Sequence, residues 1–126
     1  MFMDKSEIFV RLEQGQKPES IFPASGCFIA EIDGSKIQDK MSLMQALAAA
    51  FKFPAYFGKN WDALADCLRS LPDELEGYDV YILYIKNYKE MLAAYPEERN
   101  NLEEVFEDAA CFVADPCGKK LVMCFN

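Results

Sequence analysis

The sequence predicts one α/β domain with a small parallel β-sheet covered by helices. Three apolar segments of strand length, near 27–32, 78–85 and 121–125, are separated by segments with helical periodicity. Such helical crossovers are typical of parallel pairing. The chain has 126 residues, of which 52% are hydrophobic and 27% charged, so one core can form without disulfides or metals.

The first elements follow from apolar patterns and their end signals. Alternating apolar residues indicate a strand near 6–13. Residues 27–32 (CFIAEI) are almost continuously apolar and stop at Asp33, so we expect a strand that is buried on both faces. A helix is expected over 41–52, because Met, Leu and Phe recur at helical spacing after the candidate N-cap Asp39.

A second helix is expected over 60–71, with Asn60 as its N-cap and Pro72 as its end. The most aromatic and β-branched segment of the chain (YDVYILYI) then predicts a central strand. The remaining elements are a strand, a short helix, a long helix and a final strand, at 78–85, 88–95, 96–114 and 121–125.

Two absences limit the chemistry. The chain has no His, which excludes a Ser-His-Asp or Cys-His nucleophile and any zinc site that needs imidazole. It also has no glycine-rich phosphate-binding motif. We therefore expect no enzyme activity, no cofactor and no metal site.

The cysteines indicate a reducing compartment. Cys27, Cys67, Cys111, Cys117 and Cys124 are odd in number and widely spaced, which argues against a disulfide framework. Most lie in apolar or small-residue stretches and are expected to be buried, reduced thiols. The N-terminus does not resemble a secretory signal, and no run of eighteen apolar residues occurs, so we expect a cytoplasmic protein without a membrane span.

The net charge of −8 lies mostly in the second half of the chain. Residues 1–63 carry 8 acidic and 7 basic side chains, whereas residues 64–126 carry 13 and 6. This argues against direct nucleic-acid binding and favours a cationic partner, or only solubility. Asp62 and Asp66 are four residues apart, which stacks them on one helix face, although an ordinary solvated face would also explain them.

Residues 53–68 (FPAYFGKNWDALADCL) closely resemble the signature loop and helix of the barstar family. The pattern is an apolar residue and Pro, two aromatics, Gly, any residue, Asn, an apolar residue, Asp-Ala-Leu, any residue and Asp-Cys-Leu. The resemblance extends over about residues 26–126. It implies a barstar-like domain of residues 25–126, with three parallel strands packed by about four helices. Residues 1–24 are then an N-terminal extension that can add an edge strand.

The resemblance also implies a function, which is that of an intracellular inhibitor, an immunity protein or antitoxin, that binds and blocks the active site of a basic ribonuclease. Asp66 is then the central anchor of an acidic loop-helix surface. The implied partner-binding residues are Tyr56, Gly58, Asn60, Asp62, Asp66 and Asp108.

Two departures from the family keep other functions open. Ala65 stands where a family member has an interface Trp, and Lys59 stands where that member has an acidic residue. Both favour an alternative, a barstar-like interaction module whose partner is not a ribonuclease. A third possibility is a Mg²⁺-dependent phosphohydrolase that uses Asp62, Asp66 and Asp108.

Overall fold

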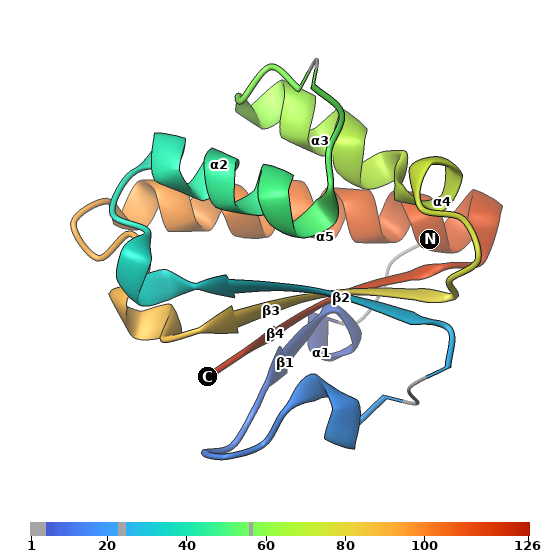
Figure 1. Ribbon diagram of the computed structural model, residues 1–126, viewed down its shortest axis with the longest axis horizontal. Helices are drawn as coiled ribbons and strands as arrows, with labels where there is room; N and C mark the ends of the chain where they lie inside the picture. Colours follow the sequence, from blue (N-terminus) through green and yellow to red (C-terminus); the bar gives the residue numbers. More distant parts are fainter. Residues whose placement is uncertain (1–4, 23–24, 56) are drawn as a thin grey trace.

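The computed structural model describes residues 5–22, 25–55 and 57–126. Within them, the chain forms one sheet covered on one side by helices (Figure 1). In chain order the elements are α1 (Lys5–Ile8), β1 (Phe9–Arg11), η1 (Pro18–Ser20), β2 (Cys27–Asp33), η2 (Gly34–Lys36), α2 (Lys40–Phe51), α3 (Trp61–Arg69), α4 (Leu71–Glu74), β3 (Val80–Lys86), η3 (Tyr88–Glu90), α5 (Pro96–Cys117) and β4 (Lys120–Phe125).

All strand pairs are parallel, and the strand order is β1-β4-β3-β2. The described residues thus form four strands rather than the three that the family resemblance implies, because the N-terminal extension adds β1 at the edge. Phe9 is paired with Met123, and the backbone N–H of Leu12 donates to the Phe125 carbonyl at 2.8 Å. The strand is shorter than the predicted 6–13, since its first residues form the helical turn α1.

Helices α2, α3 and α5 lie on one side of the sheet, and η1 lies on the other (Figure 1). Side chains of β3 alternate between these sides, as the pleat requires. Leu83 and Ile85 belong to the main core beneath the helices, whereas Ile82 and Tyr84 belong to a smaller cluster with Leu12 on the opposite face. The strand β3 is therefore buried on both faces.

The prediction that residues 27–32 are buried on both faces is wrong for part of the strand. Ala30 and Ile32 are buried in the main core, but Glu31 between them is exposed. The reason is that β2 lies at the edge of the sheet, where only the helix-facing side chains are fully covered.

The expected N-caps are confirmed, but several helix ends differ. Asp39 accepts a hydrogen bond from the Ser42 backbone N–H at 2.8 Å, completing a capping box. The helix α3 ends at Arg69, and Pro72 lies in the first turn of α4, where its missing N–H costs no hydrogen bond. The helix expected at 88–95 is only the turn η3, and the long helix extends beyond 114 to end at the left-handed Gly118.

The described cysteines are free, but they are less buried than expected. Cys124 is fully buried, and burial raises the pKa of its thiol to about 11. Cys27, Cys67 and Cys111 are half-buried. These three side chains are packed against the apolar clusters but lie at their margins.

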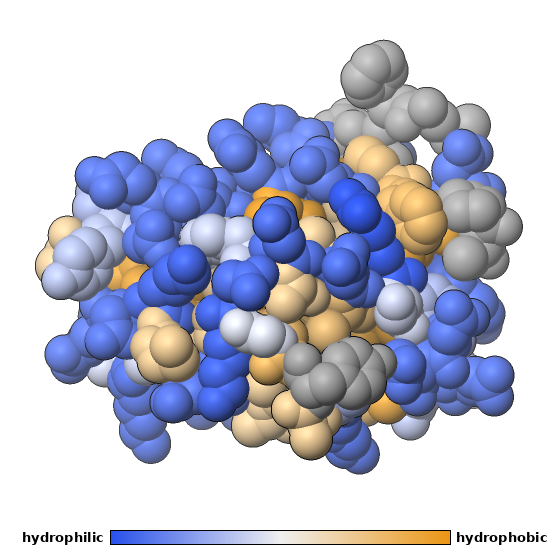
Figure 2. All heavy atoms as spheres, turned by 90° about the horizontal axis from the view of Figure 1, so that it is seen from above, coloured by the Kyte–Doolittle hydropathy of each residue, from blue (hydrophilic) through white to orange (hydrophobic). Residues whose placement is uncertain are grey.

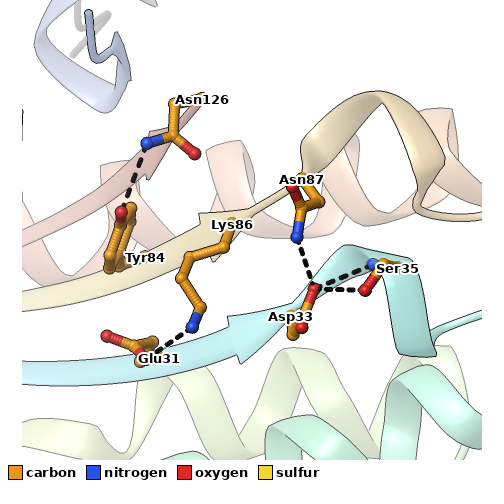
Figure 3. A network of polar contacts seen from close by, with 7 residues as sticks. All are labelled: Glu31, Asp33, Ser35, Tyr84, Lys86, Asn87 and Asn126. Carbon is orange, nitrogen blue, oxygen red and sulfur yellow. Dashed lines mark hydrogen bonds and ion pairs between the residues drawn. The ribbon is translucent and has the colours of Figure 1, made fainter. Parts of the chain in front are cut away.

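Polar side chains gather where β2, β3 and β4 end, and they bind one another (Figure 3). Lys86 pairs with Glu31 at 3.3 Å, and the Asn126 amide donates to the Tyr84 hydroxyl at 3.2 Å. Asp33 has the most partners. Its Oδ1 accepts hydrogen bonds from Asn87 Nδ2 at 2.9 Å, from Ser35 Oγ at 2.7 Å and from the Ser35 backbone N–H at 3.0 Å.

These contacts make Asp33 a bridge between the end of β2 and the end of β3. The two segments approach closely at Gly34, where an added Cβ would lie 2.4 Å from the Asn87 carbonyl oxygen. The hydrogen bond from Asn87, followed by those from Ser35, lowers the pKa of Asp33 to about 2.

We expect the contribution of Asp33 to stability to depend on pH. Because its folded-state pKa is below its ordinary value of about 3.9, the charged form stabilises the fold above pH ~4, and this contribution is lost as the pH falls toward ~2. Urea unfolding of the parent and Asp33→Ala between pH 6 and pH 2 should show a stability difference that narrows toward low pH. The exposed Glu19→Ala is the control. A difference that stays constant with pH would contradict the bridge.

Candidate functional site

The loop between α2 and α3 is held by aromatic packing. Lys52 ends α2 in the left-handed region at φ 57°. The Phe53 ring stacks on Phe51 with centroids 5.6 Å apart and contacts Phe57 at 5.0 Å. Phe57 is only 7% exposed, and its N–H donates to the Pro54 carbonyl. The loop is therefore anchored on the core before it reaches α3.

Asn60 fixes the start of α3. Its side-chain oxygen accepts a hydrogen bond from the Ala63 backbone N–H at 2.8 Å, as an N-cap does. Gly58 leaves room for this cap, since a Cβ at residue 58 would lie 3.2 Å from the Asn60 amide nitrogen. Asn60 and Gly58 are both predicted partner-binding residues. Asn60 caps the helix, and Gly58 is exposed next to it.

The helix α3 has one buried side and one acidic side. Leu64 and Leu68 are fully buried, and α3 packs against α5. Asp62 and Asp66 are exposed one turn apart, so they form a row along the exposed side of α3. The buried side of the same helix is fixed by its packing against α5. Asp62 lies in the first turn, where the helix dipole favours a negative charge.

Asp66 has the more elaborate surroundings. Its side chain is 82% exposed, and its carboxylate lies 4.0 Å from the Arg69 guanidinium. Asp66 also borders a small hollow between α3, α4 and the end of α2. The hollow is lined by Phe51, Lys52, Phe53, Pro54, Asp66, Cys67, Ser70, Leu71 and Glu74.

Asp108 lies on the neighbouring helix α5 and is exposed. Phe112, one turn further along α5, meets α3 through Arg69, whose guanidinium carbon lies 5.5 Å from the centre of the Phe112 ring. Because residues i and i+4 share a helix face, Asp108 lies on the same side of α5 as this contact. Arg69 thus joins the aspartate row of α3 to the part of α5 that carries Asp108.

A family model described as Barstar (barnase inhibitor) matches residues 27–122, which is most of the chain. The chain belongs to the barstar family. The match begins at the first residue of β2 and therefore leaves α1 and β1 outside the barstar-matched region. No curated protein matches the sequence at a significant level.

The remaining residues singled out by the barstar resemblance have different positions. Tyr56 lies outside the described residues. Lys59 is exposed in the left-handed region at φ 54°, directly before the N-cap Asn60. Ala65, which lies between Asp62 and Asp66 in the sequence, is half-buried.

Sequence reasoning missed the contact between Arg69 and Phe112. The available signal was that Phe112 falls outside the apolar stripe of the long helix (Leu102, Val105, Phe106, Ala109 and Val113), which predicts an exposed aromatic. The distance to Arg69 depends on how α3 crosses α5, and helix periodicity does not give that. A second unpredicted contact places the Lys40 ammonium 5.8 Å from the centre of the Trp61 ring.

Seen from the helix side, hydrophilic residues make up most of the surface, with smaller apolar areas between them (Figure 2). In the described part of the chain, no three acidic or cysteine side chains come together in a way that could hold a metal ion. None of the helices described is long and apolar enough to cross a membrane.

Proposed function

We propose that this protein binds and blocks the active site of a basic ribonuclease through the loop 53–59, α3 and the adjoining flank of α5. The observation that carries the proposal is the row of Asp62 and Asp66 on an N-capped, core-anchored helix in a chain of the barstar family. Barstar itself is described as the barnase inhibitor.

The chemistry of such a surface suits inhibition. A ribonuclease active site is a basic cleft that holds phosphate groups. Exposed carboxylates can take the place of those phosphates and accept charge-assisted hydrogen bonds from Arg and Lys. The rest of the acidic surface would attract a positively charged partner and speed its association.

We further propose that the protein has no catalytic activity and works in the cytoplasm. The absence of His from the sequence supports the first point. Free thiols at Cys27, Cys67, Cys111 and Cys124 support the second, since such thiols persist in reducing compartments.

The test is a titration of barnase, measured by the rate at which it cleaves RNA. We expect this protein to suppress cleavage until one equivalent has been added, and we expect the protein alone to leave RNA intact. A panel of small basic ribonucleases widens the test beyond barnase. If micromolar protein leaves every member of the panel active, the proposed function is wrong.

A second candidate is a barstar-like interaction module whose partner is not a ribonuclease. Lys59 favours it, because this exposed lysine adds a positive charge next to the start of α3 and would repel a cation of the partner. The variant Lys59→Glu separates the two. Tighter inhibition of barnase by Lys59→Glu would show that the loop contacts the enzyme. Absence of inhibition by both forms favours the second candidate.

A further inference from the structure

Phe112 is a large apolar side chain that is 48% exposed beside the acidic row. The neighbouring Phe106 and Val113 of α5 are fully buried, so packing of this helix does not require an aromatic at residue 112. Its described contact is the Arg69 guanidinium, which lies over the ring at 5.5 Å.

Arg69 is a positive charge next to the aspartate row of α3. Its guanidinium lies 4.0 Å from Asp66, and its side chain is still 42% exposed. Contacts with Asp66 and the Phe112 ring limit the orientations of the guanidinium, so less freedom is lost when it binds a further group. The remaining N–H donors can form a fork that fits a carboxylate.

We propose that Arg69 and Phe112 form a selectivity element within the partner-binding surface. The element admits a basic partner that presents a carboxylate to Arg69 and an apolar side chain to Phe112. It disfavours a partner whose cleft is basic throughout. This inference rests on the proposed function, because it assumes that the surface around Asp66 is the one that meets the partner.

The charge of Arg69 is opposite to that of the aspartates beside it, so the two favour different groups on a partner. A cleft that places cations against Asp62, Asp66 and Asp108 would place another against Arg69, and like charges at a close interface disfavour binding. A partner with one carboxylate at this point instead gains a bidentate contact, and partners without it bind more weakly. Arg is also among the residues that most often dominate the binding energy at interfaces, and Phe is enriched there.

The probes are barnase and a set of its variants, each with one Lys or Arg of the active-site face changed to Glu. Affinities are measured by calorimetry for the parent, Arg69→Glu and Phe112→Ala. Most probes should bind the parent more weakly than barnase, because they lose a cation that faces an aspartate. At least one probe should bind the parent about tenfold more tightly than barnase does. The variant Arg69→Glu should instead bind barnase more tightly than it binds that probe. Phe112→Ala should weaken binding of the same probe by about tenfold.

Matched controls separate binding from folding. Arg11→Glu changes an exposed arginine on β1, and Ile21→Ala removes a 43% exposed side chain on the other side of the sheet. Both controls should keep the parent's ranking of probes, and all variants should melt close to the parent. If the parent binds and Arg69→Glu ranks the probes in the same order, the selectivity element is wrong. If no form binds any probe and every ribonuclease of the panel stays active, the proposed function is wrong and the inference is lost with it.

Discussion

Asp66→Ala should abolish tight binding to the ribonuclease partner while leaving the fold as stable as before. The carboxylate is 82% exposed, and its one described ion pair, with Arg69, is long at 4.0 Å. Exposed pairs of this kind contribute roughly 0–1 kcal/mol. The substitution also removes repulsion from Asp62 and places a better helix former in α3. The free energy of unfolding should therefore stay within about 0.5 kcal/mol of the parent.

The free energy of binding should change much more than the free energy of unfolding. A carboxylate buried against cations in a complex leaves those cations desolvated and unpaired when it is deleted. Losses of this kind are about 2–5 kcal/mol or more, a range informed by measurements on the barnase–barstar pair itself and not worked out for this chain. Asp62→Ala and Asp108→Ala should act in the same direction, and less strongly if they lie nearer the rim.

Two further variants complete this test. Asp66→Asn keeps the shape of the side chain and removes its charge, so it should bind almost as weakly as Asp66→Ala. Glu19→Ala removes an exposed carboxylate from η1, on the other side of the sheet, and should bind like the parent. Calorimetric titration gives the affinity of each variant for the partner, and melting curves give its stability. Parent-like binding by Asp66→Ala would place the interface elsewhere, and loss of folding would make Asp66 a structural residue.

Much of the fold could be predicted, because local signals and tertiary packing agree. The aromatic and β-branched run of β3 does belong in the centre of the sheet, and Asp39 and Asn60 cap the helices as their positions predict. Predictions failed where burial depends on strand order. The apolar run of β2 gave no sign that this strand lies at the edge, and so Glu31 is exposed there.

The candidate site could be predicted only along single helices. The spacing of Asp62 and Asp66 places them on one face whatever surrounds α3. By contrast, the contact between Arg69 and Phe112 joins residues of two helices, and 43 positions of sequence separate them. No periodicity relates such residues, since the crossing of α3 and α5 is set by the whole core.

Replacing Ile8, in the N-terminal extension, should have a large effect on the stability of the fold. Ile8 is fully buried in the main core, and the adjacent Phe9 ring lies 6.2 Å from the Phe106 ring. Ile8→Ala should lower the free energy of unfolding by about 2–5 kcal/mol, through lost burial and the cavity that remains. Ile21→Ala is a control with the same chemical change at a 43% exposed position, and it should cost much less. Urea unfolding gives both values.

Removing residues 1–12 extends the test to the proposed division of the chain at residue 25. The deletion takes away α1 and β1, opens the edge of β4 and uncovers part of both apolar clusters, because Ile8 belongs to one and Leu12 to the other. An unpaired apolar edge also favours association between chains. We therefore expect the shortened protein to be much less stable and prone to aggregate. A monomer with the parent's unfolding curve would show instead that residues 13–126 fold independently and that α1 and β1 are an addition to a complete domain.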